Sequence, residues 1–526
     1  MKRLEKMLLL INTLRYLKAK QIYYRAYYTL RKKICKMAGV IPSLAVKAEG
    51  KPPNLTEGIS PPASFRNGTF TFLNLSRNFE NGIDWNFPDY GKLWTYNLTY
   101  FDFLMQEGLD RESGLALMDD FINKMPKIRD GLEPFPISLR GINWIKFISR
   151  HGIRSEKIDA SLRAQYAILE KNLEYHLLGN HLLENGFSLL FGGCYFDDKT
   201  LLRKANKILS EQLEEQILED GAHFELSPMY HQIMLYRILD CINLLTHNDC
   251  DRENLLPLLR NKASLMLGWL QNITFSDGSV PLMNDSAEGI APESEALFAY
   301  ARRLGVQPRC LPLGDSGYRT LKNRRYEAVV DVGRIGPDYI PGHAHADTFS
   351  FELHAGGKPL VVDTGTSTYE TGGRRTLERG TAAHNTVEVN RCDQSEVWGG
   401  FRVARRAGVH GLKEENGCIE AWHDGYLKKF GARHKRAFIG QKERFTVVDT
   451  VEGPSGLRCV ARLHLHPDTA VHLEGGTVMC GESVIRFKGG SPTLASYEYA
   501  PAFNSRREGI VIEVPFEKYL KTEIIP

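Results

Sequence analysis

Residues 292–305 read PESEALFAYARRLG, and residues 325–336 read RYEAVVDVGRIG. In the first stretch, apolar residues recur every three or four positions, which predicts an amphipathic helix. In the second stretch, polar and β-branched residues alternate before a glycine, which predicts a strand that ends in a turn. The period changes near Leu313 and Gly314. The sequence therefore predicts a helical domain followed by a domain of strands.

The same two patterns continue in both directions along the chain. Towards the N-terminus, residues 112–125 (ESGLALMDDFINKM) and 161–178 (SLRAQYAILEKNLEYHLL) repeat the helical period. Successive helical pairs favour an α/α array or toroid. Towards the C-terminus, residues 348–365 (TFSFELHAGGKPLVVDTG) and 483–490 (SVIRFKGG) are short strand-like runs bounded by turn residues. These runs favour a sandwich of antiparallel sheets.

A linker rich in proline and glycine, residues 50–68, separates a basic N-terminal segment from the helical region. The predicted organisation is therefore a basic helical segment with its linker (residues 1–68), an α/α toroid domain (residues 69–318) and an antiparallel β-sandwich domain (residues 319–526). No stretch of sequence approaches the roughly 20 consecutive apolar residues that a membrane-spanning helix needs.

The composition is that of an ordinary globular protein, with 42% apolar and 25% charged residues among 526. The nine cysteines are scattered and form no C-x-x-C pair. The sequence therefore predicts neither a zinc knuckle nor a disulfide framework. We expect most of the cysteines to be buried, reduced thiols.

Positive charge is concentrated at the N-terminus. Residues 1–36 hold eleven Lys and Arg against one acid, Glu5, so this segment carries +10 and the remaining chain about −6. The distribution argues against a protein that coats nucleic acid and favours a local contact with something anionic. We expect a basic amphipathic helix that either makes peripheral membrane contact or packs on the body. No cleavable signal peptide is recognised, which favours a cytoplasmic or peripheral inner-membrane location over a periplasmic one.

Polar residues gather at residues 179–186 (GNHLLENG), inside otherwise apolar sequence. In a helix, His181 and Glu184 lie three positions apart and share a face with Asn180. Such a polar island in an apolar wall is either a satisfied network of the core or a functional site.

A second polar group lies at residues 220–231 (DGAHFELSPMYH). Ser227 followed by Pro228 predicts a helix start, with Ser as the N-cap. Tyr230 then lies in the first turn, where the helix dipole favours negative charge, so its phenol could lose its proton more easily than a free tyrosine. Alternatively, Tyr230 is a buried tyrosine that hydrogen-bonds a neighbour.

A third group is His343, His345 and Asp347, at alternate positions of residues 342–347 (GHAHAD). In an extended chain these side chains share one face. Alternate histidines suit either proton transfer or a metal. With Asp363 and His384, one of these two histidines would complete an N,N,O ligand set for Zn²⁺ that leaves one position open.

These segments resemble the heparinase II/III-like family of polysaccharide lyases. The similarity continues, in one order, through LWTYNLTYFDFL (residues 93–104), SLRGINWIKF (138–147), PLMNDSAEG (281–289), VVDTGTSTYE (361–370) and AAHNTVEV (382–389). The resemblance implies an N-terminal (α/α) toroid and a C-terminal antiparallel β-sandwich, as the periodicity does. The chain's variants of the tryptophan–tyrosine motif are similar to those of members associated with capsule or exopolysaccharide synthesis.

The resemblance also implies residue roles. Tyr230 matches the tyrosine that protonates the departing glycosidic oxygen, and His343 matches the histidine that reaches into the cleft from the β domain. Asn180 or His181, with Glu184, match the residues that face the substrate carboxylate. His345, Asp363 and His384 match positions that bind structural zinc in some members, and no organic cofactor is expected. Further contacts to an anionic polysaccharide are expected from a set of polar and aromatic residues: Asn185, Arg140, Asn143, Trp144, Arg374 and Arg375.

The expected reaction is β-elimination in a uronic-acid-containing polysaccharide. Removal of the C5 proton requires that the neighbouring carboxylate be neutralised, which Asn180 and His181 could do, with Glu184 orienting His181. The base is either His343 or Tyr230 as tyrosinate, and Tyr230 is the expected acid.

Two other functions remain open from the sequence. A non-catalytic polysaccharide-binding or assembly factor would use the same cleft only to hold polymer. A glycoside hydrolase would need two carboxylates about 5–10 Å apart, for which Glu225, Asp285 and Glu184 are available.

Overall fold

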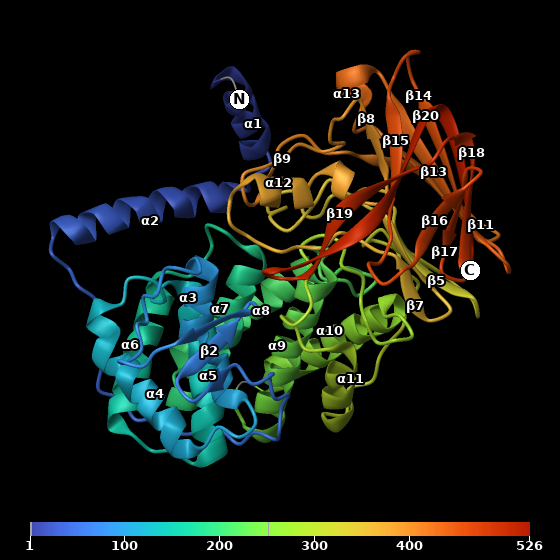
Figure 1. Ribbon diagram of the computed structural model, residues 1–526. Coiled ribbons are helices and arrows are strands. Elements are labelled where there is room, and N and C mark those ends of the chain that lie inside the picture. Colours follow the sequence, from blue (N-terminus) through green and yellow to red (C-terminus); the bar gives the residue numbers. More distant parts are fainter. Residues whose placement is uncertain (1–2, 251) are drawn as a thin grey trace.

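The computed structural model describes residues 3–250 and 252–526 and shows a helical half followed by a β half (Figure 1). The last helix of the first half ends at Arg303, and the first strand of the second begins at Tyr318. The predicted order of helices and strands is confirmed. Within the described ranges, no helix combines the length and apolar character needed to cross a bilayer.

The helical half follows a small antiparallel sheet of three strands, β1 (Phe65–Arg66), β2 (Thr69–Phe72) and β3 (Leu75–Asn78). Its helices are α3 (Lys92–Tyr100), α4 (Arg111–Lys124), α5 (Pro134–His151), α6 (Glu156–Lys171), α7 (Gly179–Phe196), α8 (Lys199–Gln216), α9 (Pro228–His247), α10 (Arg252–Ile273) and α11 (Ser294–Arg303), with 3₁₀ turns at Asp102–Met105 and Met125–Lys127.

Helix α7 lies between α5, α6 and α8 and is packed closely because of its glycines. A Cβ at Gly192 would lie 2.5 Å from the Tyr166 ring of α6, and one at Gly186 would lie 2.9 Å from Ile208 of α8. Larger residues at these positions would push the helices apart. The close packing fixes the first turn of α7, which contains Asn180 and His181, against its neighbours.

The β half begins with a four-stranded sheet of β4 (Tyr318–Lys322), β5 (Tyr326–Asp331), β6 (Phe351–Ala355) and β7 (Lys358–Val361). Short elements follow: α12 (Gly373–Glu378), a 3₁₀ turn (Thr381–Ala383), β8 (Val387–Val389), β9 (Val397–Trp398), β10 (Arg402–Val403) and α13 (Leu427–Phe430). The remaining strands are β11 (Val409–Glu415), β12 (Cys418–His423), β13 (Arg433–Gly440), β14 (Phe445–Glu452), β15 (Cys459–His464), β16 (Val471–Glu474), β17 (Thr477–Cys480), β18 (Ser483–Gly490), β19 (Thr493–Ala502) and β20 (Ser505–Ile525).

These later strands, with β8, make an antiparallel sheet of eleven strands in the described part of the chain, organised around the long β20. The two sheets share one hydrophobic core. Phe351 of β6 contacts Phe438 of β13 and Phe445 of β14, with ring centroids 5.8 and 5.5 Å apart. The strand-rich half therefore buries two antiparallel sheets against each other.

The prediction that most cysteines are buried, reduced thiols is wrong, because among the described residues only Cys241, Cys459 and Cys480 are both free and buried, and one pair is bonded. Cys194, near the end of α7, forms a disulfide with Cys250, just before α10. The two residues are 56 positions apart in the sequence and come together only because α7 and α10 lie in the same helical assembly. The other seven cysteines, all within the described residues, are free.

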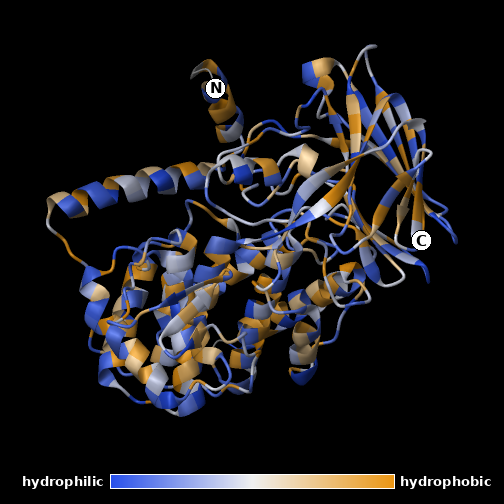
Figure 2. Ribbon diagram, in the orientation of Figure 1, coloured by the Kyte–Doolittle hydropathy of each residue, from blue (hydrophilic) through white to orange (hydrophobic). Residues whose placement is uncertain are grey.

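The basic N-terminal segment forms two helices, α1 (Arg3–Leu14) and α2 (Ala19–Met37), and α2 extends along the edge of the helical half (Figure 1). Met1 and Lys2 lie outside the described residues. We call residues 3–41 the N-terminal arm. Figure 2 shows that both helices carry hydrophobic and hydrophilic bands in alternation.

Candidate functional site

The centre of the site is a tyrosine of the helical half packed on a histidine of the β half. The rings of Tyr230 and His343 stack with centroids 3.9 Å apart. The predicted helix start is confirmed, since Pro228 is the first residue of α9 and the Ser227 hydroxyl accepts from the Tyr230 N–H at 3.2 Å. This cap places the Tyr230 ring where α9 meets the loop that carries His343. The Tyr230 hydroxyl lies 3.4 Å from that of Tyr369.

The orientation of His343 is set by Asp285. The imidazole Nδ1 lies 2.9 Å from Asp285 Oδ2. An ionised carboxylate can only accept, so Nδ1 carries the proton and Nε2 keeps a lone pair in the neutral ring. That Nε2 lies 3.7 Å from Glu225 Oε2, beyond hydrogen-bond distance. The nitrogen is therefore available to take a proton.

Asp285 is itself fully buried and held by four side chains, those of His343, His345, Arg375 and Thr366. The Arg375 guanidinium donates to both of its oxygens, and His345 Nε2 donates to Oδ1 at 2.9 Å. Burial acts to raise the pKa of Asp285, but Arg375 and the hydrogen bonds from His343 and His345 outweigh it and hold the pKa well below its usual range. Asp285 is thus a fixed negative charge behind His343.

Asn180 is joined to the same centre through Glu225. Its backbone N–H donates to Glu225 Oε1 at 3.0 Å, and its side-chain Nδ2 donates to Oε2 at 2.7 Å. Gly179 permits this approach, because a Cβ there would lie 2.8 Å from Glu225 Oε1. The Asn180 amide keeps a second N–H and its carbonyl oxygen for a ligand.

His181 has a different carboxylate partner from the predicted one. Its Nδ1 lies 3.1 Å from Glu174 Oε1, and its ring packs on Phe135 with centroids 4.7 Å apart. Burial acts to lower the pKa of His181, but Glu174 outweighs it and raises the pKa. The side chain keeps 35% of its surface exposed. His181 is therefore a partly exposed group that takes up a proton more readily than a free histidine.

Glu174 was missed because helix α6 ends sooner than its periodicity predicts. The helix stops at Lys171, and residues 172–178 form a loop. Asn185 holds this loop, since its Oδ1 accepts from the Glu174 N–H at 2.8 Å and its Nδ2 donates to Glu174 Oε2 at 3.0 Å. The prediction that Asn185 contacts substrate is wrong, because its side chain is buried and occupied by these bonds.

The role predicted for Glu184 is also wrong. Its carboxylate is fully buried and accepts from Arg237 Nε at 3.2 Å, away from His181. Burial raises the pKa of Glu184, although Arg237 counteracts this. Spacing of three along α7 placed Glu184 near His181, but the neighbouring α9 supplies a guanidinium that binds the carboxylate instead.

The prediction that Tyr230 loses its proton easily is wrong. Burial raises the pKa of Tyr230 above its usual value, and the hydrogen bond with Tyr369 only partly opposes this. Nearby negative charges, Asp285 and Glu225, act in the same direction as burial. Desolvation therefore outweighs the helix dipole, and the phenol stays protonated at neutral pH.

Three predicted substrate contacts on α5 are interior residues. Arg140 is fully buried and donates to Gln165 Oε1 at 2.7 Å, and Asn143 donates to the Tyr100 carbonyl at 2.9 Å. Trp144 is fully buried in the helical core. These predictions are wrong because α5 turns this face towards its neighbouring helices.

The two predicted arginines of the β half differ from each other. Arg375 is fully buried on Asp285, so it positions that carboxylate and the prediction that it contacts substrate is wrong. Arg374 is partly exposed and is paired at 2.6 Å with both Glu378 and Glu498. A substrate contact by Arg374 stays a prediction.

The three predicted zinc ligands lie together behind the site. His384 Nδ1 donates to Asp363 Oδ2 at 2.7 Å, and the His345 and His384 rings are 5.3 Å apart. Nδ1 of His345 and Nε2 of His384 are buried without hydrogen-bond partners, as metal ligands would be without their ion. Asp363, however, lies behind His384, and no group of three or more His, Cys, Asp or Glu among the described residues is arranged to hold a metal. Zinc binding stays a prediction.

The segment that carries the two histidines is not the strand expected. Residues 343–350 are irregular, and β6 begins only at Phe351. His343 and His345 nevertheless meet at one carboxylate, Asp285, which draws them together from a bent backbone.

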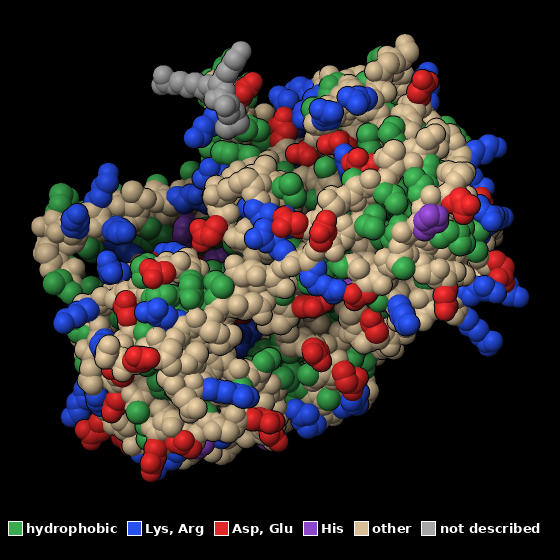
Figure 3. All heavy atoms as spheres, in the orientation of Figure 1, with side chains coloured by type: hydrophobic (Ala, Val, Ile, Leu, Met, Phe, Trp, Pro, Cys, Tyr) green, Lys and Arg blue, Asp and Glu red, His purple; other side chains and the backbone are tan. Residues whose placement is uncertain are grey.

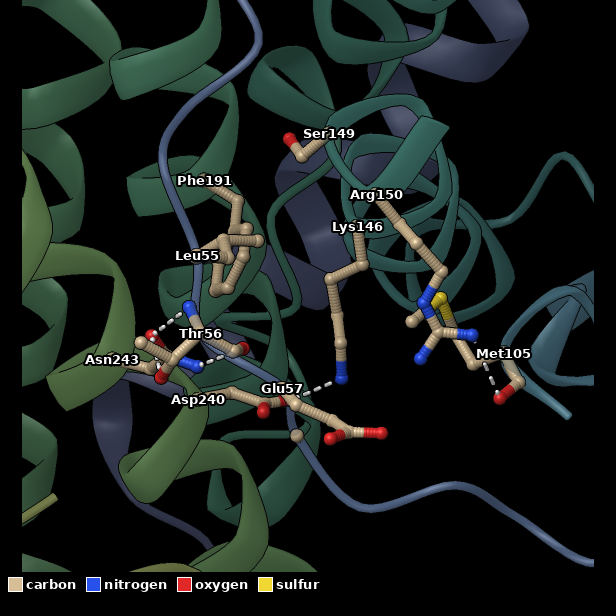
Figure 4. A pocket seen from close by; sticks show the side chains of 11 residues that line it. Leu55, Thr56, Glu57, Met105, Lys146, Ser149, Arg150, Phe191, Asp240 and Asn243 are labelled. Carbon is tan, nitrogen blue, oxygen red and sulfur yellow. Dashed lines mark hydrogen bonds and ion pairs between the residues drawn. The ribbon is translucent and has the colours of Figure 1, made fainter. Parts of the chain in front are cut away.

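A separate cavity of about 370 Å³ lies at the other end of α5 (Figure 4). The buried amine of Lys146 points into it and pairs with Asp240 at 2.7 Å. Helix α5 carries both Phe135, which lies beside His181, and Arg150, which lines this cavity. At 1.5 Å per residue, about 22 Å of helix separates the two residues. The cavity is therefore distinct from the tyrosine–histidine centre.

Two family models match the chain. Residues 158–301 match the model described as Heparinase II/III N-terminus, and residues 307–524 match the one described as Heparinase II/III-like, C-terminal. Together they cover more than half of the chain, and every residue of the tyrosine–histidine centre lies within them.

Two curated relatives are named heparin-sulfate lyase. The one from Bacteroides stercoris is 26% identical over 315 residues, which are 53% of this chain and 44% of that protein. The one from Bacteroides thetaiotaomicron is 25% identical over 324 residues, 52% of this chain and 44% of that protein. The match spans less than half the length of these relatives.

Solved structures share the fold. Heparinase III superposes with a TM-score of 0.67 and 16% identity, covering 85% of this chain and 80% of that one. A chondroitin AC lyase from Streptomyces coelicolor, in complex with chondroitin sulphate, has a TM-score of 0.54 and 11% identity, covering 82% and 75%.

Proposed function

The chain belongs to the heparinase II/III-like family, and on this premise we propose that it is a polysaccharide lyase that cleaves an acidic, uronic-acid-containing polysaccharide by β-elimination. The observation that carries the proposal is the contact between Tyr230 and His343, with Asp285 behind the histidine. This contact unites a proton acceptor and a proton donor in one place. We also assign the helical half to a toroid and the β half to a sandwich, as in the family.

The substrate carboxylate is neutralised by the groups of α7. A uronate anion resists loss of its C5 proton, because the product would hold two negative charges on one group. His181, whose pKa Glu174 raises against the effect of burial, supplies positive charge, and the free N–H of Asn180 supplies a hydrogen bond. Together they lower the cost of the enediolate-like intermediate.

His343 is the base and Tyr230 the acid. Nε2 of His343 takes the C5 proton, the C–H electron pair becomes the C4=C5 double bond, and the C4–O bond breaks. The leaving oxygen receives the phenolic proton of Tyr230. Burial favours this assignment over a tyrosinate base, because it raises the pKa of Tyr230. Solvent then restores both groups to their starting protonation.

A hydrolase is disfavoured by the state of its candidate carboxylates. Glu225, Asp285 and Glu184 are all buried, and each is held by a partner from another segment. Two exposed carboxylates on either side of a glycosidic bond are what a hydrolase requires. A binding or assembly factor remains the alternative that an activity assay separates from the lyase.

The biological setting is a proposal of its own. We place the reaction within exopolysaccharide or capsule metabolism, following the sequence resemblance. Disulfides persist in oxidising compartments and are rare in the cytoplasm. The bond between Cys194 and Cys250 therefore favours an oxidising compartment over the cytoplasm.

The test is the ultraviolet absorbance of the unsaturated uronate that elimination creates. Purified protein would be incubated with heparan sulfate, hyaluronan, alginate, polyglucuronate and an exopolysaccharide of the host. The variants Tyr230→Phe and His343→Ala should abolish the rise in absorbance. Tyr519→Phe and His472→Ala, at exposed positions of the β half, are matched controls that should leave it unchanged.

A rise that only the two site variants remove supports the lyase. Tight polymer binding with no rise on any polymer contradicts it and supports a binding or assembly factor. Release of new reducing ends without a rise in absorbance contradicts it in favour of a hydrolase.

A further inference from the structure

The exposed hydrophobic side chains of the molecule are concentrated on the N-terminal arm. Among the described residues, twenty-four large hydrophobic side chains are exposed, and fourteen of them lie between residues 4 and 41. These fourteen are Leu4, Met7, Leu8, Leu10, Ile11, Leu14, Ile22, Tyr23, Tyr27, Leu30, Ile34, Met37, Val40 and Ile41. A concentration of exposed apolar side chains of this kind marks an interaction site.

Helix α2 presents these residues as one stripe. Tyr23, Tyr27, Leu30, Ile34 and Met37 follow the spacing of three and four that lines one helical face. Leu30 is 60% exposed and Ile34 50% exposed. The stripe therefore faces away from the protein along most of the helix.

A different face of α2 holds the arm to the body. Gln21 is buried and donates to the Leu177 carbonyl at 3.0 Å. Tyr24 stacks on Tyr175 at 4.8 Å, and Tyr28 donates to the Leu173 carbonyl at 2.6 Å. These side chains account for the attachment of the arm, so the apolar stripe is not needed for packing within the chain.

Helix α1 is attached in a similar way. The Trp398 indole donates to the Thr13 hydroxyl at 3.0 Å, and the guanidinium of Arg406 lies 3.8 Å from the centre of the Tyr16 ring. The apolar residues from Leu4 to Leu14 point elsewhere and are exposed. Both helices are thus fixed on the body while their apolar residues remain uncovered.

Exposed basic residues accompany the stripe on α2. By helical spacing, Lys20 and Lys33 lie on either side of the stripe, and Lys32 and Lys36 lie on the opposite face. Figure 3 shows Lys and Arg side chains beside hydrophobic ones along this helix. Glu5 is the one acid in residues 1–36. An apolar face flanked by cations is the surface that lies in the plane of a bilayer, with its side chains among the acyl chains and its cations at anionic headgroups.

We propose that the N-terminal arm docks the protein on the surface of a bilayer that contains anionic lipids. A second copy of the chain is a poorer occupant, because pairing two arms would bring two strongly cationic segments together. The proposal does not depend on the lyase activity, since no residue of the arm belongs to the tyrosine–histidine centre.

The experiment is co-sedimentation of the full chain with lipid vesicles. One set is phosphatidylcholine alone, and the other is phosphatidylcholine and phosphatidylglycerol in equal amounts. We expect the protein to sediment with the mixed vesicles and only weakly with the neutral ones. Leu30→Glu/Ile34→Glu should weaken binding at least about tenfold, because burial of one such side chain already contributes about that factor.

Leu412→Glu/Leu494→Glu is the matched control. It makes the same change at exposed apolar residues of the β half and should bind as the unmodified protein does. Lys32→Glu/Lys33→Glu leaves the apolar stripe intact and should remove the preference for anionic vesicles. Near-ultraviolet circular dichroism confirms that each variant is folded.

Three outcomes would overturn the proposal. In the first, the protein stays in the supernatant with both kinds of vesicle. In the second, Leu30→Glu/Ile34→Glu binds the mixed vesicles as well as the control Leu412→Glu/Leu494→Glu does. In the third, analytical ultracentrifugation shows a dimer that Leu30→Glu/Ile34→Glu dissociates, without vesicle binding, which assigns the stripe to a second copy.

Discussion

The replacement Tyr230→Phe separates the chemistry of the site from its packing. Phenylalanine keeps the ring that stacks on His343 at 3.9 Å and removes only the hydroxyl. The hydrogen bond lost, to the Tyr369 hydroxyl, is long at 3.4 Å. We therefore expect the free energy of unfolding to fall by no more than about 1 kcal/mol.

The expected loss of activity is much larger. Proton transfer by a positioned side chain contributes about 10²–10⁴ to the rate, which corresponds to about 3–5 kcal/mol of activation free energy. Initial rates of absorbance increase on the polymer that proves to be the substrate would give kcat/KM. We expect kcat/KM to fall by that factor while the melting temperature falls by a few degrees at most.

Tyr369→Phe is the control for this prediction. It removes the same hydrogen bond from the other side and leaves the Tyr230 hydroxyl in place. Its kcat/KM should stay within about fivefold of the unmodified protein, because one weak hydrogen bond contributes about 1 kcal/mol. Equal losses in the two variants, or a loss of less than tenfold in Tyr230→Phe, would refute the assignment of Tyr230 as the acid.

Three further predictions concern the surroundings of the site and the fold. Glu174→Gln should move the alkaline limb of the kcat/KM profile to lower pH. Glu174 raises the pKa of His181, so activity that needs the imidazolium persists up to that raised pKa. Without the carboxylate, this activity should be lost at a lower pH. The stability that this pair contributes is present below the unfolded-state pKa of His181 and disappears as pH rises through the folded one, which urea unfolding across pH would show. Cys194→Ser should lower the free energy of unfolding by about 4 kcal/mol, since the bond to Cys250 closes a loop of 56 residues. In the unmodified, denatured protein, reduction should raise the number of titratable thiols by two. If zinc binds, the purified protein should contain about one equivalent by elemental analysis and His384→Ala should not; absence of zinc from both would remove the metal from the account.

The local features of the site were predictable because they depend on neighbouring residues. Ser227 and Pro228 define a helix start by themselves, and the structure has that cap. The motifs around Asn180 and His343 identified two positions that the fold does bring to one centre, through Glu225. Hydrophobic periodicity was also enough to predict where the chain changes from helices to strands, because the period shows which side of each element is buried.

The partners of these residues could not be predicted in the same way. A spacing of three placed Glu184 beside His181, but the partner is Glu174, in a loop that follows an earlier helix end. Asp285, 58 positions from His343, had been considered only as a hydrolase carboxylate, and its role behind the imidazole was not expected.

The sequence by itself determined the two kinds of secondary structure, their order and the helix cap, and it named Tyr230 and His343 as candidates. Only the tertiary structure decided which carboxylate orients each histidine, that the arginine at 375 is buried, and that burial keeps the proton on Tyr230. The reason is physical. Periodicity and capping follow from contacts a few residues apart, whereas desolvation and ion pairing depend on what packs across the interface, as with Tyr369, 139 positions from Tyr230.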